Sequence, residues 1–456
     1  MENYSSLERD LSDMKAYFGT GKTKEASWRQ SQLKALHKFL LENEDQIFKA
    51  LNQDLGKPQV EAFRDEVGTL IKTLNFVTKS LKQWMAGKEA KLPRIAVLSS
   101  AEIVAEPLGL VLIFSSWNFP LGLSLEPLIG AVAAGNSVVL KPSEMSPACS
   151  SLLANVLPSY LDSNAIKIIQ GGPTLGELLL KQRWDKIFFT GSARVGRIVM
   201  SAAAEHLTPV SLELGGKCPA LLDSLATTWD REMPLLKDGI KKMFGENPRE
   251  SKSIARIVNK QHFLRLKSLI NSDPKVKESV VLGGSFDEDN LFIEPTILVD
   301  PPLESAIMTD EIFGPLLPII TVEKIEDSVK FINSRAKPLA IYAFTKNKSL
   351  QKRMVAETSS GSLVFNDAIV QYIADTLPFG GVGESGFGKY HGKFSFDIFS
   401  HHKAVARRSY YTDFWYRFPP WTLKKLQLLE VSYNLDYIGI LLVLLGLRRS
   451  NRKFIN

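Results

Sequence analysis

The feature that most constrains the fold is an alternation of short apolar runs and helical segments between Leu108 and Leu214. The apolar runs, which are typical of strands, lie at Leu110–Phe114, Val138–Leu140, Ile166–Ile169, Ile187–Phe189 and Val210–Leu214. Helical periodicity fills the intervals at about 122–134, 146–160, 174–182 and 194–206. Strands that are apolar on both faces and alternate with helices form a parallel sheet covered by helices. The sequence therefore predicts an α/β protein with a doubly wound parallel sheet.

Helical and α/β patterns continue on both sides of this region. Before it, residues 25–56 and about 61–85 carry apolar side chains at helical spacing. After it the alternation is looser, with helices expected near 236–243, 259–271 and 325–334, and strands near 279–282, 293–298, 317–322 and 340–345. A single core stops growing at roughly 250–300 residues, so a chain of 456 residues needs this second α/β region. The glycine-rich residues 376–393 are expected to form a long ordered loop.

The net charge of +7 is confined to the C-terminal tail. Residues 403–456 contain ten Lys or Arg and three Asp or Glu, which leaves 46 against 46 in the rest of the chain. A neutral body without a basic stripe argues against nucleic acid as a partner. With 45% apolar and 23% charged residues, the composition also excludes a disordered chain. Neither a signal peptide nor an Arg-rich transit segment is expected from Met1–Tyr4.

The tail has the features of a membrane-surface anchor. Its uncharged run Tyr437–Leu447 is followed by Arg448 and Arg449, and the preceding Trp421–Val431 is amphipathic. The run is shorter than the roughly 20 residues that span a bilayer, so it would lie at the surface. We therefore expect a place at the cytoplasmic face of an intracellular membrane, such as the endoplasmic reticulum, or in the cytosol. The alternative is a tail helix packed on a dimer partner.

The chain has only two cysteines, Cys149 and Cys218. They are too few and too far apart for a disulfide framework, and they form no CxxC pair of the kind that binds structural zinc. A reducing compartment is the best match.

A helix start that suits an anion follows the fourth strand, in Phe189-Thr190-Gly191-Ser192-Ala193-Arg194-Val195-Gly196. Unpaired N–H groups and the helix dipole both favour a phosphate at such a point. Gly191 would allow a ligand to approach the backbone, and Gly196 would allow the helix to pack closely on the sheet. A purely structural junction is the alternative, because most α/β proteins contain one.

A second glycine motif is rejected as a phosphate loop. Gly381-Val382-Gly383-Glu384-Ser385-Gly386 satisfies the G-x-G-x-x-G pattern. A dinucleotide site requires a buried strand before this motif and a helix after it, and neither is predicted here.

Polar residues also follow other strands of the predicted sheet, where ligands of α/β proteins bind. Ser116, Trp117 and Asn118 follow the first strand, and the Asn118 amide could donate to an oxyanion. Lys141 and Glu144 follow the second strand and could hold ribose hydroxyls, or simply cap turns. Glu213 ends an apolar strand, where burial would raise its pKa and suit a general base. A structural ion pair is the alternative for Glu213.

Together these stretches resemble the aldehyde dehydrogenase superfamily, over about residues 10–405. The family's motifs occur in its order: Trp117-Asn118-Phe119-Pro120, Lys141-Pro142-Ser143-Glu144, Phe189-Thr190-Gly191-Ser192, Leu212-Glu213-Leu214-Gly215-Gly216-Lys217, Glu311-Ile312-Phe313-Gly314-Pro315 and Pro378-Phe379-Gly380-Gly381-Val382. Phe365-Asn366-Asp367 and Gly388-Lys389-Tyr390-His391-Gly392 resemble class 3, whose members include fatty-aldehyde enzymes, and most of all its plant branch.

The resemblance implies two doubly wound parallel-sheet α/β domains, a small bridging element and a C-terminal tail. The dinucleotide-binding domain would comprise residues 1–85 and 106–212, and the catalytic-type domain residues 213–370, shortened near 223–243. Residues 86–105 and 371–405 would form the bridging and oligomerisation element of a homodimer. Residues 410–456 would form the anchor, as in class 3 fatty-aldehyde enzymes.

The resemblance also assigns the site. NAD or NADP would contact Ser116, Trp117, Lys141, Glu144, Thr190, Gly191, Ser192, Val195, Gly196, Glu311 and Phe313. Asn118 would be the oxyanion donor and Glu213 the general base, and no metal is implied. In the family a cysteine thiolate attacks the aldehyde, the hemithioacetal passes hydride to NAD(P)⁺, and water activated by the glutamate hydrolyses the thioester.

The family's nucleophile is missing from this sequence. A Gly-Gln-x-Cys motif should follow Glu213 by a few tens of residues, but Leu221–Ser224 runs through Trp229–Met233 into Lys241–Pro248. No cysteine follows Cys218. We expect neither Cys218, beside Lys217, nor Cys149, in an apolar helix, to replace it. The absent block would remove a helix and a strand, and leave apolar surface of the second domain uncovered.

Two hypotheses follow. The chain is either a shortened or incorrectly assembled form of an enzyme that oxidises medium- or long-chain aliphatic aldehydes to carboxylic acids, or a catalytically silent protein that binds the cofactor or forms oligomers. Loss of the nucleophile would impair the first activity by several powers of ten.

Overall fold

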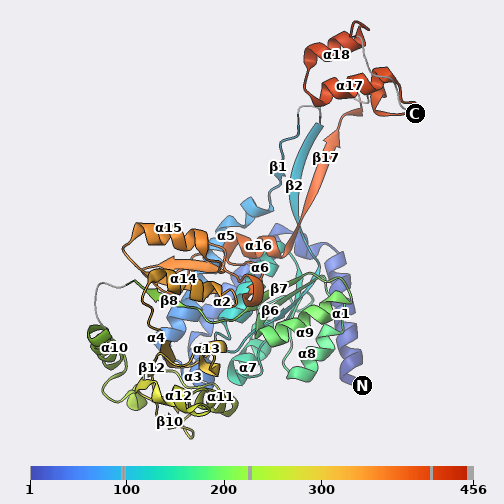
Figure 1. Ribbon diagram of the computed structural model, residues 1–456. Coiled ribbons are helices and arrows are strands. Elements are labelled where there is room, and N and C mark those ends of the chain that lie inside the picture. Colours follow the sequence, from blue (N-terminus) through green and yellow to red (C-terminus); the bar gives the residue numbers. More distant parts are fainter. Residues whose placement is uncertain (1, 94–95, 97–98, 224–228, 411–413, 449–456) are drawn as a thin grey trace. The chain divides into compact units, whose positions relative to one another are not determined.

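The computed structural model describes residues 2–93, 96, 99–223, 229–410 and 414–448 (Figure 1). The chain forms two compact units. The first comprises residues 1–84 and 107–401, and the second comprises residues 85–106 and 402–456. The predicted boundaries of functional domains stay predictions. Residues 224–228, which belong to the stretch expected to be shortened near 223–243, and the last residues of the tail, 449–456, lie outside the described residues.

A six-stranded sheet forms the centre of the first unit, in the order β16-β7-β6-β3-β4-β5. Its strands are β3 (Leu110–Phe114), β4 (Ser137–Lys141), β5 (Ile166–Ile168), β6 (Lys186–Gly191), β7 (Val210–Leu214) and β16 (Gly386–Phe387). The five strands expected from the alternation all form, and they pair in parallel. Every residue of β3 and β4 is buried, which explains why these runs are apolar on both faces. The glycine-rich segment is not only a loop, since β16 pairs antiparallel with β7 at the sheet edge.

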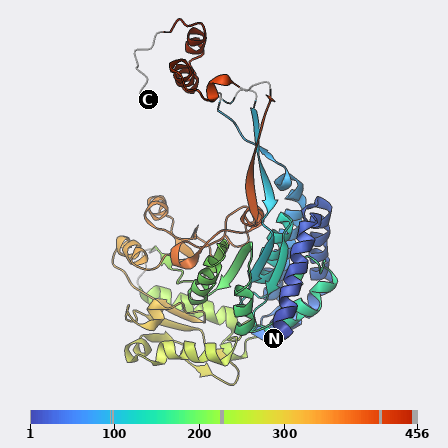
Figure 2. The same cartoon turned by 90° about the vertical axis from the view of Figure 1, so that its right-hand side faces the viewer.

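Helices cover both faces of this sheet (Figures 1 and 2). They are α1 (Glu2–Gly19), α2 (Ala26–Glu42), α3 (Glu44–Leu55), α4 (Gln59–Ala62), α5 (Gly68–Met85), α6 (Gly122–Ala134), α7 (Pro147–Asn155), α8 (Pro173–Leu180), α9 (Ala193–Ala204) and α16 (Gly392–Ile398). On one face, Phe189 belongs to a core that α1, α8 and α9 share. On the other face, the Phe188 ring contacts Tyr390 and Phe399 beside α16. Successive strand residues therefore bury opposite faces, as predicted.

The strand order reverses between β3 and β6. From β3 the chain builds outward through β4 and β5, and then crosses to β6 and β7 on the other side. The loops after β3 and β6 therefore diverge at the carboxyl ends of these two strands, which is where doubly wound sheets bind ligands; we call this region the crevice. Residues 115–121 and 191–192 follow these two strands and therefore lie at this end of the sheet.

The second α/β region differs from the expected single parallel sheet. Within the described residues it contains two three-stranded sheets, in the orders β13-β12-β9 and β15-β14-β8. The strands are β8 (Ala220–Leu222), β9 (Val280–Leu282), β12 (Thr296–Val299), β13 (Leu316–Ile319), β14 (Ala340–Phe344) and β15 (Ser362–Phe365). In the first of these sheets β9 is antiparallel to β12, so it is not a doubly wound parallel sheet.

Each small sheet has its own core. The helices α11 (Lys260–Asn271), α12 (Pro274–Glu278) and α13 (Ala306–Thr309) pack on the sheet that contains β12, beside the hairpin of β10 (Phe286–Asp287) and β11 (Phe292–Ile293). The sheet that contains β14 is packed by α14 (Ile325–Asn333) and α15 (Lys348–Glu357). Two separate cores explain why the helices and strands form where expected although no continuous sheet does.

The edge strand β8 marks the point where the predicted missing segment would begin. Leu221 is buried, but Leu222 is 55% exposed. The next described element is α10 (Trp229–Phe244), in which Leu235 and Met243 are exposed. Both elements thus expose apolar side chains, and the absence of a strand and a helix from this domain stays a prediction.

The second unit consists of a small sheet and a helical pair. Its sheet has the order β1-β2-β17, formed by Lys88–Glu89, Ser99–Pro107 and Ser400–Arg408. Arg407 contacts Glu102 at 2.5 Å across β2 and β17. The helices α17 (Leu423–Tyr433) and α18 (Tyr437–Leu444) share a core of Leu428, Val431 and Val443. In the described part of the chain, no helix has the length and apolar character needed to cross a membrane.

Candidate active site

The helix α9 begins at the crevice with an intact N-terminal cap. Ser192 is exposed, and its Oγ accepts a hydrogen bond from the Val195 N–H at 3.4 Å. A Cβ added at Gly196 would lie 2.9 Å from Leu214, so this glycine is what allows α9 to lie directly on the sheet. The positive end of a twelve-residue helix thus faces the crevice, which is the arrangement that suits a pyrophosphate.

Lys141 and Glu144 meet at the end of β4. The buried Lys141 ammonium lies 2.7 Å from the Glu144 carboxylate and also donates to the Pro142 carbonyl at 3.3 Å. The Glu144 side chain is 41% exposed, so solvent and a ligand can reach the pair. The pair is suited to bind ribose hydroxyls, with the ammonium as donor and the carboxylate as acceptor.

Glu213 is a buried carboxyl group without partners. It is 5% exposed, and neither of its carboxyl oxygens has a hydrogen-bond partner in the described structure. Burial raises its pKa well above the ordinary value of 4.5. Thr190 lies opposite it on β6, and its Oγ1 is also buried without a partner. Buried polar groups are nearly always satisfied, so these two residues mark a place built to bind something else.

The turn that carries Asn118 is held by an ion pair that sequence reasoning missed. The Lys57 ammonium lies 2.6 Å from the Glu66 carboxylate, and both residues are buried. Glu66 also accepts hydrogen bonds from the N–H groups of Leu121 and Gly122, at 2.8 and 3.1 Å. Lys57 lies 4.4 Å from the centre of the Phe119 ring. No local sequence pattern reveals the pair, because the turn that it stabilises lies some 60 residues further along the chain.

Three rings form one wall of the crevice. Trp117 contacts Phe313 with ring centres 5.2 Å apart, and His262 on α11 with ring centres 5.1 Å apart. Two of these residues were predicted; His262 was missed, since a lone histidine at a helix start carries no signal. Glu311 lies next to this wall, against Gly215, and accepts a hydrogen bond from the Gly216 N–H. Burial raises the pKa of Glu311.

Ser116 lies in the same turn and is half-buried. The structure thus brings together Thr190 with Glu213, Lys141 with Glu144, and Trp117 with Phe313. The rejected glycine motif leads into β16 rather than a helix, and Gly386 pairs with Glu213.

Neither cysteine has the surroundings of a nucleophile. Cys149 is fully buried in α7, and burial and the nearby Asp54 raise its pKa. Cys218 reaches the surface, but protein atoms around its sulfur desolvate the thiolate and raise its pKa as well. The ammonium of Lys217 does not counteract this, because it donates to the carbonyls of Ile307 and Asp310 at 2.6 and 3.1 Å.

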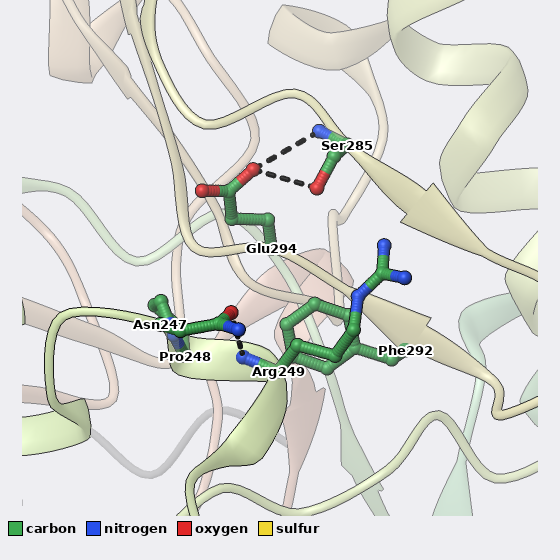
Figure 3. A pocket seen from close by; sticks show the side chains of 6 residues that line it. All are labelled: Asn247, Pro248, Arg249, Ser285, Phe292 and Glu294. Atoms are coloured by element: carbon green, nitrogen blue, oxygen red, sulfur yellow. Dashed lines mark hydrogen bonds between the residues drawn. The ribbon is translucent and has the colours of Figure 1, made fainter.

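A pocket of about 300 Å³ lies elsewhere, beside the hairpin β10–β11 (Figure 3). Its polar groups bond one another: Glu294 accepts from Ser285 Oγ at 2.7 Å, and Asn247 accepts from the Arg249 N–H at 3.2 Å. None of the predicted site residues lines it. The predicted site residues therefore lie apart from this pocket.

Comparison with known proteins identifies the family to which the chain belongs. The model of the aldehyde dehydrogenase family matches residues 3–230 and 226–405. Aldehyde dehydrogenase family 3 member F1 of Arabidopsis thaliana is 48% identical over 482 residues, which cover 97% of this chain and 99% of the relative.

Solved structures share the fold. A substrate-bound AldH of Staphylococcus aureus has a TM-score of 0.90 and 37% identity, and covers 94% of this chain and 99% of its own. An indole-3-acetaldehyde dehydrogenase in complex with NAD⁺ has a TM-score of 0.81 at 22% identity, over 89% of each chain. NAD or NADP is the cofactor of the family, and the start of α9 with its close-packed Gly196 fits such a dinucleotide. The chain is a member of the aldehyde dehydrogenase family, among its family 3 proteins.

Proposed function

We propose that this chain keeps the cofactor and base residues of an aldehyde dehydrogenase but lacks the cysteine that makes the reaction fast. The observation that carries the proposal is Glu213, a buried carboxyl group without partners. Such a group costs stability, and its use in the family is to act on a substrate beside it. In the described residues no thiol with a lowered pKa accompanies it.

The absence of the nucleophile segment is supported by two further observations. The alignment to the Arabidopsis relative is 482 residues long, although this chain has 456. The family model also matches in two pieces that meet at 226–230. The alignment therefore contains positions at which this chain has no residue, and the match to the family model is interrupted at 226–230.

The residues that remain have definite roles in our proposal. The pyrophosphate binds at the start of α9, to Thr190, Gly191, Ser192, Val195 and Gly196. The adenosine ribose binds to Lys141 and Glu144. The nicotinamide end is surrounded by Ser116, Trp117, Glu311 and Phe313. When bound, NAD(P)⁺ accepts the hydride that leaves the aldehyde carbon. The Asn118 amide donates to the developing oxyanion, and the Glu213 carboxylate takes a proton from water.

The substrate that suits the site is a medium- or long-chain aliphatic aldehyde. Tyr372 contacts Phe119 with ring centres 6.3 Å apart, so the segment around Tyr372 borders the turn that carries Asn118. This segment exposes Ile369, Val370, Ile373 and Leu377. Exposed apolar side chains beside the site favour an alkyl chain.

The proposal is tested by restoring the nucleophile segment. The segment that the Arabidopsis relative has in excess would be inserted between residues 223 and 243, and NADH formation would be followed with a medium-chain aldehyde. We expect the insertion to raise the rate by about three powers of ten or more, and the same insertion with Cys→Ala to give no gain. Turnover of the unaltered chain at the rate of the inserted one would overturn the proposal.

Cofactor binding tests the part that this proposal shares with the alternative of a silent protein, and activity after the insertion separates the two. Titration of the unaltered chain with NADH and NADPH, followed by nicotinamide fluorescence, should give saturable binding of at least one of them. A silent cofactor-binding or oligomer-forming protein would bind in the same way, but it would remain inactive after the insertion. Sequencing the transcript then distinguishes a genuine short form from an incorrectly assembled sequence.

The second unit is proposed to bind a membrane surface. Trp415, Trp421, Ile438 and Leu441 are exposed on or beside the pair α17–α18, and Lys424 lies among them. Exposed aromatic and aliphatic side chains with cationic neighbours suit an interface with anionic lipid. A chain that ends at Ser409 should no longer sediment with anionic vesicles; if it sediments as before, the anchor is elsewhere. Analytical ultracentrifugation of both chains tests the alternative that the tail packs on a partner in a homodimer.

A further inference from the structure

Three side chains that the proposed reaction does not use converge behind the crevice. Glu126 comes from α6, Asp375 from the segment between β15 and β16, and His391 from the residue that precedes α16. Each offers one ligand atom, and these atoms all lie within 4.8 Å of one another. Residues distant in sequence are thus brought to one point inside the first unit.

Two of the three carry buried atoms with no partner. Glu126 is 2% exposed and His391 is 1% exposed. Glu126 Oε1 and His391 Nε2 have no hydrogen-bond partner in the described structure. Unpaired polar atoms at this depth destabilise a fold unless something else binds them. The two atoms therefore point to an occupant.

His391 is held in the orientation of a ligand. Its ring hydrogen-bonds the Tyr372 backbone, which leaves Nε2 available, and it stacks on Phe379 at 5.3 Å. Its backbone has φ of 81°, an uncommon value for a residue other than glycine, and its N–H donates to Ser395 Oγ at 2.8 Å. A backbone partner on one ring nitrogen and a free second nitrogen is the usual arrangement of metal-binding histidines. Strained backbone of this kind is often found at functional sites.

Asp375 is held in place by weaker partners. Thr73 donates to its Oδ1 at 3.0 Å, and the Lys72 ammonium lies 3.1 Å from its Oδ2. The Lys72 ammonium also donates to the Ile373 carbonyl, and the side chain is 41% exposed, so the ammonium can leave Asp375 and stay solvated when another cation arrives.

We propose that Glu126, Asp375 and His391 bind a divalent transition-metal ion, Zn²⁺ being the best match, which displaces the Lys72 ammonium from Asp375. Two carboxylate oxygens and one imidazole nitrogen are zinc ligands, and two carboxylates balance the charge of the ion. Ligand atoms each about 2.1 Å from zinc are at most about 4.2 Å apart, so small rotations of the carboxylate ends complete the site. Water would take the fourth position.

The ion would tie the segment 372–391 to α6. That helix begins directly after the turn that carries Asn118, and Tyr372 of the segment contacts Phe119 in the same turn. The metal would therefore act as a structural link behind the active site, and no step of the aldehyde reaction passes through it.

The experiment uses the full chain after treatment with a chelator. Zinc is added in competition with a chromophoric chelator, and bound zinc is measured by mass spectrometry after gel filtration. We expect one zinc ion per chain. Loss of an outer partner of a metal ligand costs about 10–100-fold in affinity, so Glu126→Gln, which removes a ligand, should cost about 100-fold or more.

A second variant should change the zinc affinity in the opposite direction, and the substitution leaves the buried core intact. Lys72→Met removes the competing cation from a partly exposed position, and should tighten zinc binding about tenfold or more. His206→Asn, at an exposed histidine of the same unit, is the matched control and should leave the affinity unchanged. Co²⁺ in place of zinc should give visible absorption bands in the unaltered chain that are lost in Glu126→Gln.

The outcome that overturns the proposal is definite. If the chain binds no stoichiometric zinc, or if Lys72→Met and Glu126→Gln bind it as the unaltered chain does, there is no metal site. The cluster would then be a Glu126 carboxyl group that shares its proton with His391.

Discussion

Lys57 and Glu66 form a buried ion pair, 2.6 Å apart, directly beneath the turn that carries Asn118. The Asn118 carbonyl accepts a hydrogen bond from the same ammonium at 3.4 Å, and the next two N–H groups of the chain after Pro120 reach the same carboxylate. One pair therefore fixes the backbone on both sides of Pro120. The pair should therefore contribute to the free energy of unfolding as well as to the position of Asn118.

Lys57→Met should destabilise the protein by about 3–5 kcal/mol, because it leaves the Glu66 carboxylate buried without its counter-charge. Urea unfolding measures the free energy. Lys38→Met is the matched control, since Lys38 and Glu42 form an exposed pair 3.6 Å apart that is worth at most about 1 kcal/mol. Equal losses in the two variants would show that the buried pair is not special.

Glu213→Gln should change how stability depends on pH. Burial raises the pKa of Glu213 in the folded state above 4.5, so between 4.5 and the raised value the folded chain binds more protons than the unfolded one. Stability therefore falls as pH rises through this window, by about 1.4 kcal/mol for each unit of pKa difference. The glutamine variant lacks this fall and should gain stability relative to the unaltered chain as the pH rises above 4.5.

Urea unfolding at several pH values gives the comparison. Glu278→Gln, at an exposed position of α12, serves as the control and should leave the pH dependence as it is. If the difference between Glu213→Gln and the unaltered chain were constant with pH, Glu213 would not titrate with a raised pKa.

The central sheet could be predicted because its strands carry their own signal. β3 forms at Leu110–Phe114 and α6 at Gly122–Ala134, in agreement with the expected ranges, since complete burial makes a strand apolar on both faces. β16 has only two residues, Gly386 and Phe387, and its partner β7 lies far away in the sequence. Such a pairing leaves no local periodicity, so it could not be predicted.

The residues of the candidate site also fall into those that the sequence could predict and those that it could not. Lys141 with Glu144 and Thr190 to Gly196 were found because their motifs are contiguous. Lys57 with Glu66 and His262 with Trp117 depend on tertiary packing, so no spacing reveals them. The division of the second α/β region into two sheets also follows from packing, because each short helical or strand segment keeps its own pattern whether or not a continuous sheet forms.

Gly196→Ala should weaken dinucleotide binding. The added Cβ would lie 2.9 Å from a methyl carbon of the buried Leu214, so either this side chain or α9 would have to shift, at a cost of about 1–3 kcal/mol. The gain in helix propensity, about 1 kcal/mol, offsets part of this. Nicotinamide fluorescence titration measures the affinity. Gly176→Ala in α8 is the control, because its Cβ would lie 3.9 Å from Phe114 and only the gain in propensity should remain. Equal affinities in the two variants would exclude close packing of α9 as a condition of binding.

Cys218→Ser should leave residual NADH formation unchanged. Cys218 lies five residues after Glu213, but desolvation raises its pKa and Lys217 is turned toward backbone carbonyls, so the thiolate is scarce at neutral pH. For the same reason iodoacetamide should react slowly at pH 7, and the rate should still be rising above pH 9, the ordinary pKa of the thiol. Mass spectrometry follows the alkylation of Cys218, with the buried Cys149 as an unreactive internal reference. A loss of NADH formation in Cys218→Ser, together with fast alkylation at pH 7, would identify Cys218 as a replacement nucleophile.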